Sequence, residues 1–127
     1  ALNNCGYCVE HHYQGLVRLL DDAEKSAAIR AAIDAGDAEA APLAPKEIAA
    51  LDYARALTVD PSSVSEAMVD DLRSLGYDDG EILEINQVTA YFSYANRTVL
   101  GLGCSTEGDI LGLSPNNSDN PDDWSHS

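Results

Sequence analysis

Hydrophobic residues recur every three or four positions along most of this chain, which is the spacing of an amphipathic helix. The pattern predicts five helical segments, over residues 3–20, 21–36, 45–60, 61–76 and 78–102. None of the sequence shows a convincing alternation of apolar and polar residues, the pattern that indicates a half-buried strand. Helices joined by short connections predict an all-α helical bundle.

Residues that start and stop helices separate these segments. The expected starts are an N-cap at Asn3 or Asn4, capping boxes at Asp21/Glu24, Ser63/Glu66 and Asp78/Glu81, and Pro45 at a first helical position. Gly36 and Gly76 are expected to end the second and fourth helices. Residues 37–44 are predicted to form a loop.

The last segment is the longest, and its apolar residues follow one stripe. The stripe comprises Ile82, Ile85, Val88, Phe92, Ala95, Val99 and Leu102. Tyr91 and Tyr94 lie outside it. Aromatic residues off the core face are typical of contact with a second subunit, although a tyrosine can also extend its hydroxyl to solvent. We expect this face to contribute to a homo-oligomer.

The helical pattern fades after Gly103, where Pro, Asn, Asp and Ser become frequent. Residues 104–127 are therefore predicted to form an extended C-terminal tail. Trp124 is the candidate anchor of this tail, in a groove of its own subunit or of a neighbour.

Composition limits the possible partners of this chain. With 127 residues it is long enough for one domain, and 22 acids against 7 bases give a net charge of −15. Such a surface argues against nucleic acid and anionic membranes as partners, because both require basic patches. No apolar run approaches the ~20 residues of a spanning helix, and no signal-peptide features are present. We expect a cytoplasmic protein.

The candidate chemistry lies in a C-x-x-C motif near the start of the first helix. On a helical wheel Cys5, Cys8 and His12 fall within an arc of about 60°. Leu16 and Leu19 continue this face, so we expect it to point inward. The two cysteines lie one turn apart, which allows a disulfide if the helix start relaxes slightly.

This geometry suits dithiol chemistry, in which the thiolate is the reactive form. A helix N-terminus favours the thiolate of Cys5, whereas His12 favours that of Cys8. One cysteine attacks and the other resolves the sulfenic acid. The residues alone leave the two roles open.

Other interpretations of the motif are weaker. A zinc site would combine the two cysteines with histidine and Cys104, but the second C-x-x-C pair usual in structural sites is missing. A thioredoxin fold would need strands around the motif, and a structural disulfide suits secreted proteins. Two inert buried cysteines remain an alternative. We expect His11 to be a surface residue and Cys104 to be buried or half-exposed.

The run Cys5-Gly6-Tyr7-Cys8-Val9, followed by His12, resembles the alkylhydroperoxidase D family of the carboxymuconolactone decarboxylase-like superfamily. Residues 72–82, 86–88, 91–97 and 101–103 are similar to its peroxidase-related branch, so the resemblance covers about residues 3–104. It implies an oligomeric all-α bundle, of which residues 1–103 would be the C-terminal part.

The resemblance also implies an activity, an antioxidant peroxidase that reduces hydroperoxides with a dithiol reductant and no cofactor. By position, Cys8 would attack the peroxide, Cys5 would resolve the sulfenic acid, and His12 would belong to the proton relay. Relatives often carry His where Tyr7 stands, and their relay Glu lies on the helix before the first cysteine. We therefore expect this chain to be the C-terminal portion of a longer polypeptide. The alternative is a non-catalytic redox sensor or structural oligomer with a switchable dithiol.

Overall fold

The computed structural model describes residues 1–112, which form helices and no strand. The five α-helices are α1 (Gly6–Leu20), α2 (Ala23–Ala35), α3 (Pro45–Val59), α4 (Glu66–Ser74) and α5 (Asp79–Leu102). Two short 3-10 turns, Ala38–Ala40 and Pro61–Ser63, lie in the connections before and after α3. The all-α prediction is confirmed. Trp124, the predicted anchor of the tail, lies outside the described residues.

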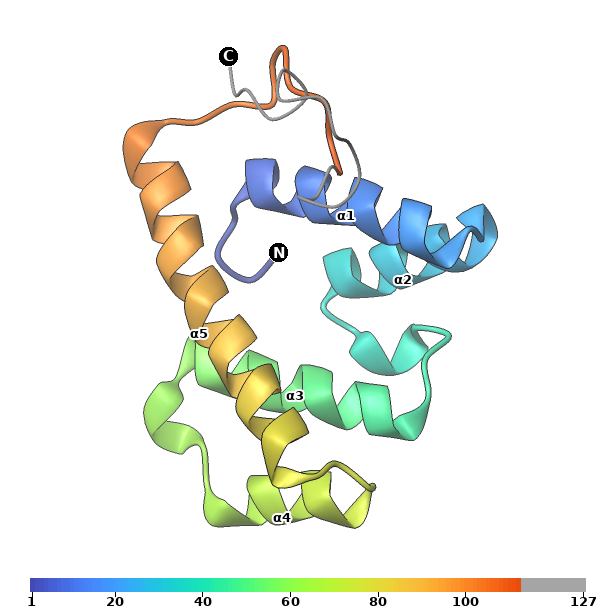
Figure 1. The fold of residues 1–127 in the computed structure, drawn as a ribbon, viewed down its shortest axis with the longest axis vertical. Helices are drawn as coiled ribbons and strands as arrows, with labels where there is room; N and C mark the ends of the chain where they lie inside the picture. The colour runs from blue at the N-terminus through green and yellow to red at the C-terminus, as the bar shows by residue number, and fades with distance from the viewer. Residues whose placement is uncertain (113–127) are drawn as a thin grey trace.

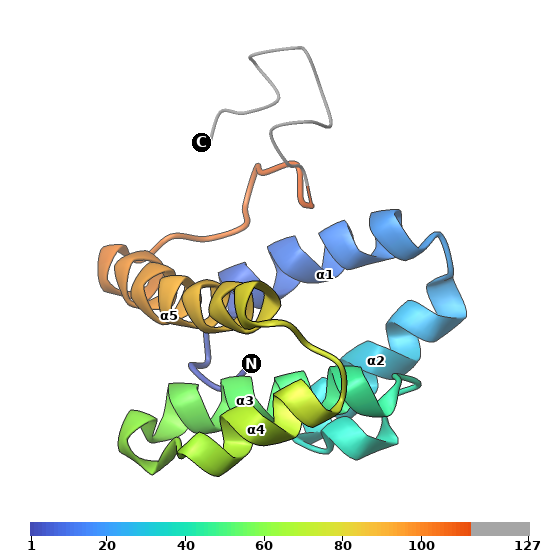
Figure 2. The same ribbon diagram turned by 60° about the horizontal axis from the view of Figure 1, so that its bottom comes forward.

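The helices form two groups that the long helix α5 links (Figure 1). Helices α1 and α2 pack together as one pair, and α3 and α4 pack against the first half of α5. The second half of α5 reaches the start of α1, and the chain then returns over α1 (Figures 1 and 2). The N-terminal residues lie between the two groups. This arrangement places the C-x-x-C helix beside the C-terminal part of α5.

The core lies in the α3–α4–α5 group. Its buried centre consists of Tyr53, Leu72 and Ile82, one residue from each helix. The Tyr53 hydroxyl is satisfied there, because it accepts a hydrogen bond of 2.8 Å from the side-chain amide of Asn86. A buried hydroxyl without such a partner would be costly, so this bond lets an aromatic ring fill the core. This core anchors the first half of α5.

Several predicted helix boundaries are confirmed. Asp78 and Glu81 form the expected capping box, with reciprocal hydrogen bonds of 2.8 and 2.9 Å. Pro45 is the first residue of α3, and Gly36 ends α2 in the left-handed conformation. The capping signal of α5 is local in sequence, which is why the sequence alone locates it.

Other predicted boundaries are wrong. Helix α1 begins after Cys5, because the Cys5 sulfur occupies the N-cap position that we assigned to Asn3 or Asn4. Helix α2 is capped by Asp22, whose carboxylate accepts from the backbone N–H of Lys25. The predicted start at Asp21 fails because that residue has a left-handed backbone and ends α1.

The expected capping box Ser63/Glu66 is also absent. Ser63 belongs to the 3-10 turn, and its hydroxyl donates to the carbonyl of Asp60. Helix α4 starts at Glu66, and Ser65 is its N-cap residue. It ends at Ser74, shortly before Gly76, which has a φ of 92°. The loop predicted for residues 37–44 contains the turn Ala38–Ala40.

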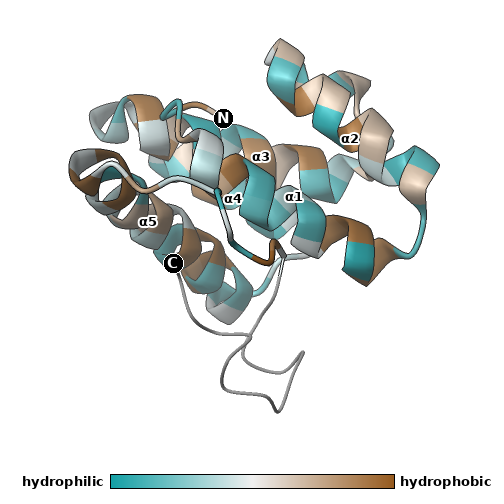
Figure 3. Ribbon diagram, turned by 90° about the horizontal axis from the view of Figure 1, so that it is seen from above, coloured by the Kyte–Doolittle hydropathy of each residue, from teal (hydrophilic) through white to brown (hydrophobic). Residues whose placement is uncertain are grey.

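The apolar stripe of α5 is buried only in part. Ile82 is buried, and Ile85, Phe92, Ala95 and Val99 are half-buried, but Val88 is exposed and Leu102 is 77% exposed. The prediction is wrong at these two positions for different reasons. Leu102 is the last residue of α5, beyond the helices that cover it, whereas Val88 lies in the middle of α5 and lines an open cavity. Tyr91 and Tyr94 lie off the stripe as expected, and both are exposed. The C-terminal turns of α5 are strongly hydrophobic in Figure 3.

Candidate functional site

The two cysteines of the C-x-x-C motif lie at the first turn of α1. A disulfide joins Cys5 to Cys8, with 5.4 Å between their Cα atoms, as the one-turn spacing predicted. The Cys5 sulfur also accepts from the backbone N–H of Cys8 at 3.4 Å, so it caps the helix. The side chains differ in access, because Cys5 is 1% exposed whereas Cys8 is half-buried.

His12 lies one turn after Cys8, and both residues line a cavity of about 340 Å³. This confirms that they share a face of α1. The His12 ring remains exposed at one side, and at the other it packs edge-on against Phe92 of α5, with 4.6 Å between ring centroids. Loss of solvent around the ring, and then the neighbouring His11, lower the pKa of His12 below its usual value. His12 is therefore a neutral imidazole at pH 7, which can accept a proton.

The predicted inward face of α1 is incomplete. Leu16 lines the same cavity as Cys8 and His12. Leu19 was expected to point inward but is 86% exposed. The reason is positional: Leu19 lies in the last turn of α1, beyond the stretch that meets α5, and the chain reverses into α2 directly afterwards.

The cavity is one end of a longer apolar groove. It adjoins a second cavity of about 310 Å³, with which it shares Ala1, Ile33, Phe92 and Asn96. The second cavity extends along α3 and α5. The apolar side chains that line the two cavities include Val9, Leu16, Ile29, Ile33, Leu51, Val88 and Phe92. An elongated, mostly uncharged molecule fits such a lining better than an ion does.

Polar contacts fix both ends of the wall around Cys8. The Asn3 side-chain amide donates to the side-chain oxygen Oδ1 of Asn96 at 2.9 Å. At the other end, Arg30 donates to Glu10 at 2.8 Å and to Asp34 at 2.6 Å. These two bonds, Glu10 first, raise the pKa of Arg30. The guanidinium charge is thus matched by two carboxylates at the rim of the cavity.

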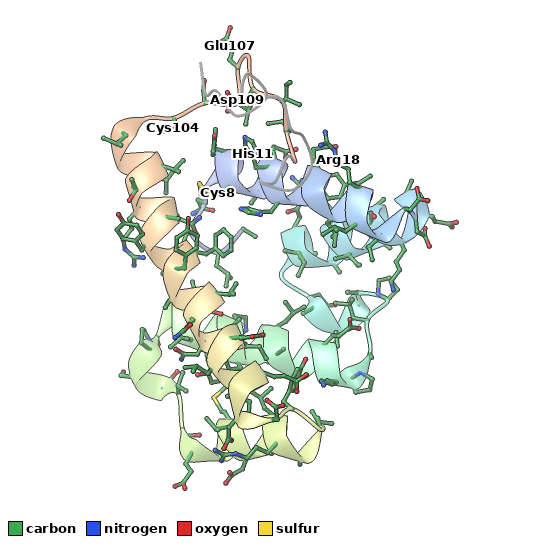
Figure 4. All side chains as sticks on the ribbon, viewed as in Figure 1. Cys8, His11, Arg18, Cys104, Glu107 and Asp109 are labelled. Carbon is green, nitrogen blue, oxygen red and sulfur yellow. A yellow bond between two sulfur atoms is a disulfide. The ribbon has the colours of Figure 1, made fainter. Side chains whose placement is uncertain are left out.

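A polar cluster that the sequence did not reveal lies on another side of α1. The Tyr7 hydroxyl donates to the Asp109 carboxylate at 3.0 Å, and Nε2 of His11 lies 3.4 Å from the same oxygen. The Asp109 side chain is 3% exposed and that of His11 is 16% exposed. Figure 4 shows Asp109 next to His11 over α1. The prediction that His11 is a surface residue is therefore wrong.

The cluster changes the acidity of Tyr7. Burial, followed by the hydrogen bond and negative charge of Asp109, raises the pKa of Tyr7 to about 12. Both causes oppose ionisation, because a phenolate would lose hydration and would face a carboxylate. Tyr7 therefore remains a neutral hydrogen-bond donor at physiological pH.

The segment after α5, residues 104–112, is packed directly on the α1 backbone. Gly112 has a φ of 75° and is buried against Gln14 and Gly15. A Cβ at Gly112 would lie 2.6 Å from backbone atoms of both residues, so only glycine fits there without displacement. This part of the predicted tail is held in place by Gly112 and Asp109.

The third cysteine does not join the site. Cys104 carries no disulfide and is exposed, contrary to the expectation that it is buried or half-exposed. It follows Gly103, where the chain leaves α5 and turns toward α1. Within residues 1–112 no three His, Cys, Asp or Glu side chains gather closely enough to hold a metal ion. The described part of the chain thus contains no ligand set for the zinc alternative.

None of the helices within residues 1–112 has the length and apolar character needed to cross a membrane. No protein-family model matches the chain, and no curated protein sequence matches it. The residues of the site are a disulfide-bonded cysteine pair at a helix start, a histidine one turn away and an apolar groove that Cys8 and His12 line.

Proposed function

We propose that this protein is a thiol-dependent peroxidase, similar to alkylhydroperoxidase D, that reduces hydroperoxides through Cys5 and Cys8. The supporting observation is that Cys8 and His12 line the same cavity while Cys8 is within disulfide distance of Cys5. A substrate in the groove would meet Cys8 first, because Cys5 is almost completely buried. Access therefore favours Cys8 as the attacking residue, in agreement with the family resemblance.

The proposed cycle starts from the reduced dithiol. His12 accepts the proton of the Cys8 thiol, and the thiolate attacks the terminal oxygen of the hydroperoxide. An S–O bond forms, the O–O bond breaks, and the departing alkoxide takes the proton that His12 holds and leaves as an alcohol. The Cys5 thiol then attacks the sulfenic sulfur, which forms the disulfide and releases water. A dithiol reductant restores both thiols by exchange.

The lining of the groove favours organic hydroperoxides over hydrogen peroxide. Burying an apolar tail against residues such as Ile33 and Leu51 stabilises a bound substrate by about 25 cal/mol per Å² of surface removed from water. Hydrogen peroxide has no such tail. The predicted substrate is an uncharged organic hydroperoxide that places its peroxide group at Cys8.

We also propose that the exposed face of α5 associates with a second copy of the chain. Between residues 85 and 102 the single charged residue is Arg97, although the chain as a whole carries a net charge of −15. Tyr91, Tyr94 and Leu102 are exposed on this helix. Two acidic chains repel each other least where carboxylates are missing, and apolar side chains supply the attraction. Light scattering tests this, since Tyr94→Glu is expected to reduce the oligomer to monomers.

A redox switch without turnover is the second candidate. Tyr7 lies between the two cysteines and also holds Asp109. Reduction of the disulfide would act on the helix turn that presents Tyr7, and could thereby release residues 104–112. The same dithiol would then report the redox state instead of consuming peroxide.

Turnover separates the two candidates. Reduced protein is incubated with an excess of cumene hydroperoxide and dithiothreitol, and the remaining peroxide is measured. A peroxidase consumes many equivalents, Cys8→Ser abolishes the consumption, and Cys104→Ser is the matched control that keeps it. If the protein consumes only one equivalent of peroxide and then stops, the peroxidase is rejected and the switch is favoured.

A further inference from the structure

We propose that Asn96 binds the peroxide group in front of Cys8 and donates its amide N–H to the oxygen that leaves. This inference rests on the proposed peroxidase function and assigns a substrate-binding residue to it. The resemblance assigns no such role to α5. The spacing of the C-x-x-C motif identifies residues of α1 only.

The position of Asn96 follows from the packing of α1 on α5. Phe92 packs on His12, and Asn96 lies one helical turn after Phe92. On α1, Cys8 lies one turn before His12. All four side chains line the cavity of about 340 Å³, so Asn96 and Cys8 occupy its walls on the two helices. Asn96 also lines the adjoining cavity, which places it where the two spaces meet.

The orientation of Asn96 follows from its hydrogen bond. Its side-chain oxygen accepts from the Asn3 amide at 2.9 Å. The group that Asn96 can offer to a ligand is therefore its amide nitrogen, which is a donor. Arg30, the cationic donor of the same cavity, is already held by Glu10 and Asp34. His12 is the proton acceptor of the proposed reaction. Tyr13 and Ala1 also line this cavity, but Asn96 is the donor that α5 contributes where the two cavities meet.

The reaction needs a donor at this point. As the Cys8 sulfur bonds to the terminal oxygen and the O–O bond breaks, negative charge builds up on the other oxygen. A fixed N–H aimed at that oxygen stabilises the transition state more than the ground state. An amide is suited to this role because it stays neutral at all relevant pH values. It does not compete with His12 for the proton.

Three variants test the assignment in the full chain. The reduced protein is mixed with cumene hydroperoxide in a single turnover, and the loss of free Cys8 thiol is followed on the plateau of the pH profile. Asn96→Leu is expected to lower the second-order rate constant by about 10²-fold, the usual effect of removing one donor to a developing oxyanion. Asn96→Asp keeps the shape and the acceptor for Asn3 but has no N–H, and is expected to lose a similar factor. Asn3→Ala removes the bond but keeps the donor, and is expected to lose less than about 10-fold.

A wild-type rate in Asn96→Leu would overturn the proposal. So would an equal loss in Asn3→Ala, because the bond to Asn3 would then be the part that matters. Circular dichroism checks that each variant keeps its helices. A rate for Asn96→Asp equal to that of the wild type would also reject the donor role.

A binding measurement keeps the test independent of turnover. Cumyl alcohol, the product of cumene hydroperoxide, is titrated into Cys8→Ser protein with and without Asn96→Leu, and binding is followed by NMR. Weaker binding in the double variant supports the site, even if the wild type shows no peroxide turnover. Equal binding in both proteins, together with wild-type turnover in the single variant Asn96→Leu, would reject the role of Asn96 and leave the peroxidase intact.

Discussion

The carboxylate of Asp109 accepts a hydrogen bond of 3.0 Å from the Tyr7 hydroxyl, which ties the segment after α5 to the helix that carries both cysteines. The two residues are 102 positions apart in sequence. The bond is shielded from solvent, since the Asp109 side chain is 3% exposed. A hydrogen bond to a charged group in such surroundings is stronger than an exposed neutral one.

The first prediction concerns the ionisation of Tyr7. A titration followed by phenolate absorbance is expected to show one of the six tyrosines ionising near pH 12, well above the usual value of 10.0. Tyr7→Phe should remove this late step. Asp109→Asn should lower the pKa of Tyr7 toward 10, because a neutral partner repels the phenolate less.

The same shift predicts how stability depends on alkaline pH. The native state keeps the Tyr7 proton longer than the unfolded chain does, so its contribution is complete below pH 10 and is lost as the pH rises toward about 12. Urea unfolding at increasing pH checks this against Tyr7→Phe. Ionisation of all six tyrosines near pH 10 would contradict the burial of Tyr7.

The second prediction concerns Gly112. Gly112→Ala places a Cβ 2.6 Å from the α1 backbone at a positive φ, so it must displace residues 104–112. Gly103→Ala is the matched control, because it also has a positive φ but no atom lies within 4 Å of its Cβ. We expect Gly112→Ala to lower the free energy of unfolding by about 1–3 kcal/mol more than the control does. Equal losses, measured by urea unfolding, would show that the contact between Gly112 and α1 adjusts to a Cβ without a cost in stability.

The third prediction separates the roles of the two cysteines. After one equivalent of peroxide, Cys5→Ser should carry a sulfenic acid on Cys8 that dimedone traps, because no resolving thiol remains. Wild-type protein should instead lose ~2 Da in the peptide that contains both cysteines, as expected when a disulfide forms. Sulfenic acid on Cys5 in the Cys8→Ser variant would reverse the roles, and a disulfide to Cys104 would reject the assignment.

The fourth prediction concerns the histidine of the site. Contact with Phe92 removes solvent from the His12 ring, so Phe92→Ala should raise the pKa of His12 toward 6.5. Tyr91→Ala changes an exposed neighbour and should leave it unchanged. NMR titration of the ring signals measures both. A pKa of His12 that does not respond to Phe92→Ala would show that contact with Phe92 is not what removes solvent from the ring.

Because the folded state lowers this pKa, the contribution of His12 to stability is present above pH 6.5 and is lost as the pH falls through the folded value. Urea unfolding between neutral and acidic pH, compared with His12→Gln, detects the difference. The ring is partly exposed, so the effect is expected to be small.

The fifth prediction concerns salt. A net charge of −15 on 127 residues destabilises the compact chain by self-repulsion. Raising the ionic strength from about 0.1 to 1 M shortens the screening length from about 10 to 3 Å and should raise the melting temperature. Sodium, potassium and choline chloride should act alike if screening is the cause. A response to sodium alone would indicate a specific ion site.

The sequence predicted some of the local features of this molecule, although only one of the three expected capping boxes is present. The capping box at Asp78 and the disulfide between Cys5 and Cys8 depend on residues three positions apart, and both are present. The shared cavity of Cys8 and His12 follows in the same way from a one-turn spacing. Helical periodicity determines such relationships without knowledge of the remaining chain.

Features that depend on distant residues could not be predicted. Asp109 stands in a segment with no periodic pattern, and its partners lie about 100 positions earlier. Periodicity also predicts which face of a helix is apolar, but it does not predict how much of that face other helices cover. Leu19 and Leu102 were therefore assigned to the interior although both are exposed. The start of α1 was missed because a cysteine sulfur, an uncommon cap, takes the place of a neighbouring asparagine.

The Cys5 sulfur is both half of the disulfide and the N-cap of α1. In the reduced protein the same atom can keep this position, as a thiol or as a thiolate that the helix dipole favours. The helix therefore does not have to unwind and re-form between the two redox states. A sulfenic acid on Cys8 would meet its partner at the high effective concentration of an intramolecular reaction. External thiols would then compete poorly for this intermediate, and overoxidation to the sulfinic acid would be rare.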